Sequence, residues 1–348
     1  MKGMKAYVLG AGASVNAGYP LASQLLNELS TWLDRCESSV HWVPGARNRL
    51  VQVRETFGSL EDFEGILGKL EEYGQRRVNP TAATTYGQDF KDIAHDCMEQ
   101  AHGRSDDPST STRGFYPQYL RSDLISAFRE YFYEIEEKRS ERTVYQSFAE
   151  HLPIDSTVIT FNYDLALERA FCRAGRWDVG NGYGYVAFPD RPPSATTIFK
   201  LHGSVNWFKG PMQDAPPPVI FPRDLKLLGY DDVSDPRVGP NGISIDNEGT
   251  FILPDPKKKF FWERFWSPLW NAAASQLHQA DEVFIHGYSM PDADAHARKL
   301  LFENIRKSAA VNVYCRSKST EIAGEFQTRG FTRVSSYPAI RFEEWATA

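Results

Sequence analysis

Polar side chains that can do chemistry follow two short apolar runs in this chain. Asn162 and Asp164 come directly after the run "TVITF", and His202 comes after "TTIFKL". An amide donates and accepts hydrogen bonds without carrying charge, so it can orient a water molecule. An imidazole can take up or release a proton near neutral pH. Asn162 and His202 are therefore candidates for a reacting centre.

A glycine-rich turn after the first apolar run indicates a phosphate site. In "KAYVLGAGASVNAGYPL", Gly10 and Gly12 permit a tight turn and a close approach of backbone N–H groups to phosphate, helped by the following helix N-terminus. The dinucleotide fingerprint needs a third glycine where Val15 stands, which disfavours a hydride-transferring dehydrogenase. No Gly-Lys-Ser/Thr follows the turn, which excludes a P-loop.

A third polar segment, "IHGYSMPDADAH", follows another apolar run near the C-terminus. Its candidate residues are Gly287, Ser289, Asp292 and Asp294. The two aspartates could equally be first-turn residues that oppose a helix dipole. Asp164 could likewise cap the helix that follows it, and His202 could be a satisfied interior histidine.

Strand-like runs and helix-like segments alternate at both ends of the chain and must position these residues. The runs "YVL", "TVITF", "TTIFK", "EVFIH" and "AVNVYC" predict strands, and amphipathic segments between them predict helices. One helix is expected over the apolar stripe from Leu21 to Leu33, with Pro20 in its first turn. This alternation predicts an α/β fold with a Rossmann-like, doubly wound parallel sheet, in which ligands bind beyond the carboxyl ends of the strands.

The middle of the chain interrupts this alternation. "SLEDFEGILGKLEEY" and "YPQYLRSDLISAFREYFYEIEEK" both have helical apolar spacing, and residues 76–114 are polar. We therefore expect a mostly helical insertion at residues 40–150, between two parts of the Rossmann-like domain, residues 1–39 and 151–348. Residues 209–256, rich in Pro, Gly and Asp, are expected to form a long irregular excursion.

Composition excludes several classes of protein. The formal net charge of -6 over 348 residues argues against a dedicated nucleic-acid surface. The four cysteines are isolated in sequence, so neither a zinc ribbon nor a disulfide framework is expected, and no metal is predicted. No apolar run approaches the length of a membrane span and no signal peptide is evident, so the expected location is the cytoplasm.

Taken in order, the motifs resemble those of the sirtuin, or silent-information-regulator, superfamily. The NAD turn of that family is similar to residues 10–14 with Gly18 and Pro20 downstream, and its Thr-Gln-Asn-Ile-Asp motif is similar to "TFNYD" at 160–164. Its His-Gly resembles His202-Gly203, and its later Gly-x-Ser turn resembles residues 287–289. The zinc-binding cysteines of the protein deacylases are missing. "LEDFEGIL" and "GYSMPDAD" resemble instead the zinc-less bacterial branch, whose members commonly hydrolyse NAD in anti-phage defence.

The resemblance implies a substrate and roles for individual residues. It implies catalytic roles for Asn162 and His202. Contacts with NAD are implied for Gly10, Ala11, Gly12, Ser14, Thr160, Asp164, Gly287 and Ser289. Cleavage of the bond between ribose C1′ and nicotinamide passes through an oxocarbenium-like transition state and has a good leaving group. The enzyme must therefore bury the ribose and hold a water, which suits Asn162, and handle a proton, which suits His202.

The expected function is hydrolysis of NAD to nicotinamide and ADP-ribose by a regulated effector of anti-phage defence. An unregulated enzyme would drain its own cell, so we expect control through a homo-oligomer, or through a sensor or ATPase partner subunit. Two alternatives stay open. One is an NAD-dependent protein deacylase or ADP-ribosyltransferase, and the other is a non-catalytic module that binds NAD or ADP-ribose.

Overall fold

The computed structural model divides the chain into two compact units, Met1–Leu21 with Phe132–Ala348, and Ala22–Tyr131. The residues that it describes are 3–36, 46–48, 50–51, 54, 117–138, 144–154, 156–179, 182–184, 195–208, 249–251, 263–292 and 294–347. The predicted helix in "SLEDFEGILGKLEEY" and most of the expected excursion at 209–256 lie outside these residues. The predicted boundaries of the insertion stay a prediction.

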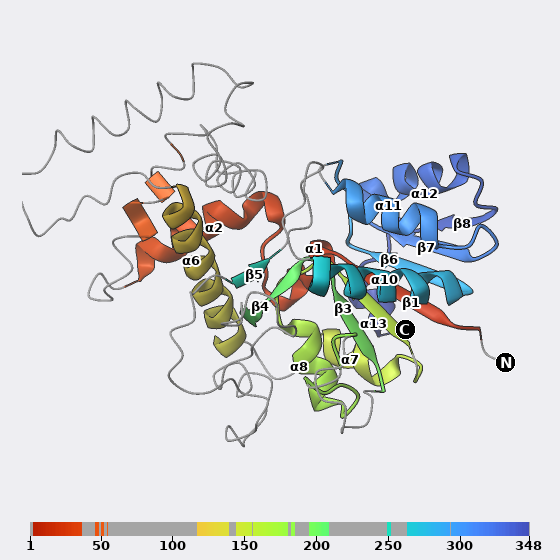
Figure 1. Cartoon of the computed structure of the whole chain (residues 1–348), viewed down its shortest axis with the longest axis horizontal. Coiled ribbons are helices and arrows are strands. Elements are labelled where there is room, and N and C mark those ends of the chain that lie inside the picture. The colour runs from red at the N-terminus through yellow and green to blue at the C-terminus, as the bar shows by residue number, and fades with distance from the viewer. Residues whose placement is uncertain are drawn as a thin grey trace, which may run out of the picture. The chain divides into compact units, whose positions relative to one another are not determined.

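The first unit is built on a six-stranded, fully parallel sheet (Figure 1). Its strands are β1 (Lys5–Leu9), β2 (Thr157–Thr160), β3 (Thr197–Lys200), β6 (Glu282–His286), β7 (Ala310–Tyr314) and β8 (Arg333–Ser336). Their order is β3-β2-β1-β6-β7-β8, so the chain adds β2 and β3 on one side of β1 and then β6, β7 and β8 on the other. The predicted Rossmann-like α/β fold is therefore confirmed, and its switch point lies between β1 and β6.

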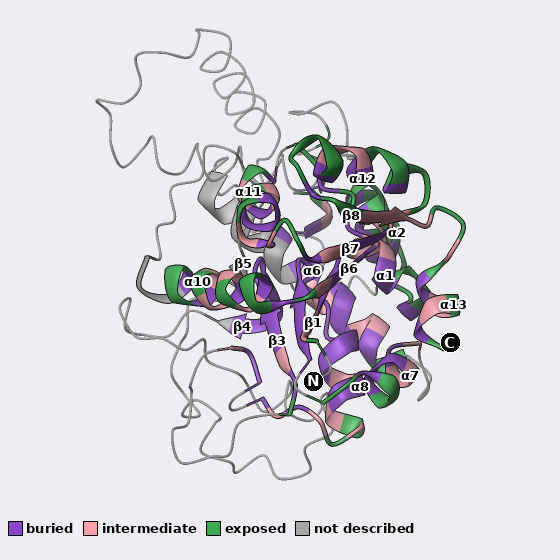
Figure 2. Ribbon diagram, turned by 90° about the vertical axis from the view of Figure 1, so that its right-hand side faces the viewer, coloured by how far each residue is buried: buried purple, intermediate pink, exposed green. Residues whose placement is uncertain are grey.

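The central strands β1, β2 and β6 form because most of their residues are apolar on both faces, as expected for a parallel sheet covered on both sides. All four residues of β2 are buried, as are four of the five in β1 and in β6. On one face Tyr7 of β1 stacks on Phe284 of β6, with ring centroids 5.1 Å apart. Helices cover both faces, so the sheet is the core of this unit (Figure 2).

Two groups of helices cover the two faces. The first group includes α7 (Val144–His151), α8 (Ala166–Arg173) and α13 (Phe342–Ala346), and the second includes α10 (Glu263–Gln279) and α11 (Ala295–Asn304). Tyr7 meets Phe148 of α7, whereas Thr157, on the other face, bonds Gln276 of α10. Helix α12 (Ser319–Thr328) packs on β7 and β8. Most of helix α7 lies within residues 40–150, the range predicted for the insertion, but the helix packs with α8 in the sheet unit.

The turn after β1 differs from its prediction. A single helical turn, α1 (Ala11–Ser14), leads into a 3₁₀ turn, η1 (Val15–Ala17), which ends at Gly18 with φ of 87°. The long helix begins only at α2 (Leu25–Arg35), after a second 3₁₀ turn, η2 (Ala22–Gln24). The expectation that Pro20 lies in the first turn of this helix is therefore wrong. Gly18 adopts the left-handed conformation that ends helices, so the first helical segment stops there. The next α-helix, which carries most of the apolar stripe, begins at Leu25.

The second unit contains α2 and the first part of α6 (Pro117–Lys138), a helix that continues into the first unit. The apolar stripe of α2 is buried, and Trp32 packs on Tyr131 with ring centroids 5.5 Å apart. Arg47 donates to the backbone oxygens of Leu33 and Cys36 and so satisfies carbonyls at the end of α2.

A small antiparallel sheet continues the chain beyond β3. It pairs β4 (Gly203–Phe208) with β5 (Gly249–Phe251). A 3₁₀ turn, η4 (Arg316–Lys318), follows β7. Within the described part of the chain, no helix is long and apolar enough to cross a membrane.

An aromatic cluster encloses His286 at the carboxyl end of β6. Its ring stacks on Tyr314 and lies against Trp345 of α13, with centroids 4.1 Å away in both cases. Neither ring nitrogen has a hydrogen-bond partner among the described residues. Burial therefore lowers the pKa of His286 from 6.5 to about 3, because no group compensates the charged form.

We expect His286→Phe to make the protein less sensitive to acid. The unfolded chain binds a proton at this histidine below pH 6.5 and the folded chain only near pH 3, so folding stability falls as pH drops through that window. Between pH 7.5 and 5.5 the variant should gain about 1 kcal/mol relative to wild type. Melting temperatures at both pH values test this, with exposed His278→Phe as the matched control. Equal pH dependence in wild type and His286→Phe would contradict it.

Candidate functional site

Three glycines bring the first turn and the β6 turn together at the switch point. The N–H of Gly10 donates to the oxygen of His286 at 2.9 Å, and that of Gly12 to the oxygen of Gly287 at 3.0 Å. A Cβ on Gly12 would lie 2.8 Å from the Cα of Gly287, and Gly287 itself has φ of 61°. The two turns therefore touch through their backbones. A larger residue at Gly12 would disturb this packing. Such a variant therefore cannot show whether the turn binds the phosphates of a ligand.

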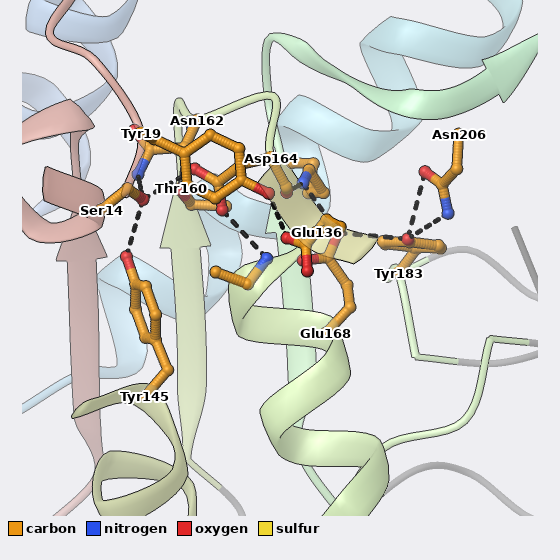
Figure 3. Close-up of polar contacts among 12 residues, drawn as sticks. Ser14, Tyr19, Glu136, Tyr145, Thr160, Asn162, Asp164, Glu168, Tyr183 and Asn206 are labelled. Atoms are coloured by element: carbon orange, nitrogen blue, oxygen red, sulfur yellow. Dashed lines mark hydrogen bonds and ion pairs between the residues drawn. The ribbon is translucent and has the colours of Figure 1, made fainter. Parts of the chain in front are cut away.

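Asn162 lies two residues beyond β2, and its amide orientation is determined by its partners (Figure 3). The Nδ2 group donates to the backbone oxygen of Gly10 at 3.0 Å and to Oγ of Ser14 at 2.8 Å. A backbone carbonyl can only accept, so the atom that faces Gly10 must be nitrogen. Both amide hydrogens are then used. The oxygen Oδ1 is left as the hydrogen-bonding group that Asn162 can offer to a ligand.

Ser14 is the centre of the network that holds Asn162. Its hydroxyl donates to Oδ2 of Asp164 at 2.7 Å and also lies 2.9 Å from the hydroxyl of Tyr145 on α7. Because its one hydrogen goes to the carboxylate, Ser14 accepts from both Asn162 and Tyr145. Only 1% of Ser14 is exposed. In this arrangement Ser14 positions Asn162, and its predicted contact with NAD stays a prediction.

Asp164 supports the start of α8 and also belongs to the network of Ser14, while its predicted contact with NAD stays a prediction. Its Oδ1 accepts from the N–H of Ala166 at 3.0 Å, which supports the start of α8, while Oδ2 accepts from Ser14. Thr160 acts nearby, since its hydroxyl accepts from the N–H of Asn162 at 3.1 Å. Both residues therefore shape the loop that carries Asn162.

His202 occupies the corresponding position beyond β3. Thr160 and Lys200 are paired in register at the ends of β2 and β3, so Asn162 and His202 each follow a paired residue by two positions. Nε2 of His202 lies 3.3 Å from Oδ2 of Asp294, and the hydroxyl of Tyr288 donates to the same oxygen. Phe161 contacts the rings of both His202 and Tyr288.

The charge of Asp294 sets the orientation of His202. Burial acts to raise the pKa of this carboxyl, but His202 and the hydrogen bond from Tyr288 outweigh it, so the pKa of Asp294 is lowered. Nε2 of His202 faces this carboxylate, which leaves Nδ1 as the ring nitrogen that can meet a ligand. A histidine oriented in this way can accept a proton from a ligand.

The structure thus forms two groups from the predicted site residues. Gly10, Gly12, Ser14, Asn162, Asp164 and Gly287 lie together with Thr160, whereas His202 belongs to a separate polar pair with Asp294. Ala11 begins α1, and Ser289 is exposed and takes part in neither network. Asp292 is also exposed and faces Arg298 at 3.7 Å.

Tyr145, Tyr288 and Asp294 are the functional candidates that sequence reasoning missed or left undecided. Asp294 precedes α11 but makes no capping bond there, because its carboxylate turns to His202. No local pattern marks Tyr145, which comes from a helix expected in the insertion. Its contact with Ser14 joins residues 131 positions apart.

The described residues contain no group of three or more His, Cys, Asp or Glu side chains suited to a metal ion. A scan against models of protein families finds no match for the chain, and a search of curated proteins finds no significant match. The fold and the positions of its polar residues define a Rossmann-like α/β protein with a polar site beyond the carboxyl ends of β1, β2 and β3.

Proposed function

We propose that this protein hydrolyses NAD to nicotinamide and ADP-ribose. The observation that carries the proposal is the orientation of two side chains: Asn162 has only its carbonyl oxygen left to a ligand, and His202 has Nδ1 left. They follow the neighbouring strands β2 and β3, and the Gly10–Gly12 turn follows β1 at the same carboxyl-terminal end of the sheet. A module that only binds nucleotide would need the glycines but neither of these oriented groups.

In the proposed reaction, water attacks C1′ of the nicotinamide ribose while the bond from C1′ to the pyridine nitrogen breaks. The electron pair leaves with nicotinamide, and the water gives up a proton. Oδ1 of Asn162 accepts a hydrogen bond from this water and holds it in place. Nδ1 of His202 takes this proton, directly or through a ribose hydroxyl that gives up its own proton and receives that of the water, and passes it to solvent, with Asp294 stabilising the imidazolium. Positioning and proton transfer are each worth orders of magnitude in rate.

We further propose that a partner or self-assembly controls this activity in anti-phage defence, in the cytoplasm, because uncontrolled loss of NAD would harm the cell that makes the enzyme. We expect such a partner to dock on the predicted insertion, residues 40–150. Full turnover by the isolated monomer, with no gain from any partner, would contradict this part of the proposal.

Incubation of the purified protein with NAD, with and without an acyl-lysine peptide, tests the reaction. Free nicotinamide without peptide is the expected result. Product only in the presence of peptide would indicate a deacylase or a transferase. Saturable binding of NAD without any product would indicate a binding module, and the hydrolase proposal would then be wrong.

A further inference from the structure

A buried ion pair lies directly beneath the two strand ends that carry Asn162 and His202. Lys200, the last residue of β3, places Nζ 2.7 Å from Oε1 of Glu168 on α8, and neither side chain is more than 1% exposed. Removing two charges from water costs several kcal/mol per ion, and such a pair seldom stabilises a fold more than apolar residues would. Its position therefore suggests a role other than stability.

Lys200 also bonds the loop that holds Asn162. Its ammonium group donates to the backbone oxygen of Asp164. From there the side chain of Asp164 accepts from Ser14, and Ser14 accepts from the amide of Asn162. Three successive hydrogen bonds thus connect Lys200 to Asn162. The backbone of the same lysine leads within two residues to His202.

Glu168 is held in turn by a second set of contacts. Oε1 accepts from the hydroxyl of Tyr183 at 3.2 Å, and that hydroxyl accepts from Nδ2 of Asn206 on β4, the strand that follows His202. Burial raises the pKa of Glu168, and the charge of Lys200 opposes this rise. The ion pair and its hydrogen bonds therefore connect α8, β3 and β4 next to the strand ends that carry the two candidate catalytic residues.

We propose that Lys200, held by Glu168, is a positioning residue that sets the placement of the Asn162 amide relative to His202. Its effect on catalysis rests on the proposed hydrolysis of NAD, whereas its effect on geometry does not. Lys200 touches no reacting atom in this scheme and acts through Asp164 and Ser14.

The test replaces the pair by neutral residues of similar size. Lys200→Met alone would leave Glu168 buried without its partner and could unfold the protein, so it is combined with Glu168→Gln. The double variant should fold, yet lose at least about tenfold in kcat with KM changed by less than about threefold. Arg306→Met with Asp281→Asn removes an exposed ion pair far from the site in the same way, and this control should keep wild-type kcat.

Two further measurements separate positioning from a general loss of structure. In an Asn162→Ala background the same double replacement should cost less than about twofold, because its target is already absent. A crystal structure of the double variant should show the Asn162 amide displaced from Ser14. Wild-type kcat in the folded double variant, or the same loss with and without Asn162, would overturn the inference. If wild type does not consume NAD, the proposed function fails, and an unchanged contact between Asn162 and Ser14 would then reject the positioning role independently.

Discussion

Replacing Asn162 with alanine is expected to lower NAD turnover by about 10²-fold or more while leaving NAD binding nearly intact. The variant removes Oδ1, the atom that orients the water, and one hydrogen bond to the carbonyl of Gly10, whereas the bonds from Gly10 and Gly12 to the β6 turn remain. Asn162→Asp should be as poor. It retains an oxygen toward the ligand, but loses both donations and places a carboxylate oxygen against the carbonyl of Gly10.

Nicotinamide release and NAD affinity, measured on folded variants, decide this prediction. Asn271 on α10 is exposed, so Asn271→Ala is the matched control and should behave as wild type. Melting curves establish that each variant is folded at the assay temperature. Wild-type turnover in Asn162→Ala would show that the catalytic assignment is wrong.

The second large effect is expected at His202. His202→Ala should also reduce turnover by about 10²-fold or more, because proton transfer in the transition state is lost. Both residues act on one transition state, so Asn162→Ala with His202→Ala should be scarcely worse than the poorer single variant. Asp294→Asn should give a smaller loss, since it removes the orienting charge but keeps the imidazole.

Asp292→Asn provides the control for that smaller loss, because Asp292 belongs to the same loop and is exposed. Its turnover should match wild type. Full additivity of the two alanine replacements would instead mean that Asn162 and His202 act in separate steps. Equal turnover in Asp294→Asn and wild type would remove Asp294 from the proposed mechanism.

Local sequence patterns were sufficient to predict most of the sheet. The run "TVITF" is apolar and β-branched, and it forms β2 because a parallel strand is buried on both faces. The last strand, β8, was not predicted, since "RVSS" is short, polar and half exposed at the edge of the sheet. Helix α13 was also missed, because its five residues are stabilised by contacts with Tyr7 and His286 rather than by their own periodicity.

The site was predictable where residues follow strands and unpredictable where distant residues meet. Asn162 and His202 could be singled out because each follows an apolar run by one or two positions. The partners that orient them could not, since contacts of Tyr145 with Ser14 and of Asp294 with His202 depend on tertiary packing. Lys200 did leave a signal in the sequence, a charged residue inside the apolar run "TTIFKL", which is typical of a buried pair.

The central place of β1 has a consequence for how the protein is made. Its neighbours β2 and β6 begin at Thr157 and Glu282, so during synthesis β1 waits for both before it can pair. At roughly 5 to 20 residues per second, about 15 to 55 s separate synthesis of β1 from that of β6. A ribosome-bound or truncated chain that ends before β6 also lacks Asp294. A protein whose proposed activity would harm its host would thus be synthesised through β6 and Asp294 before its reacting centre could assemble.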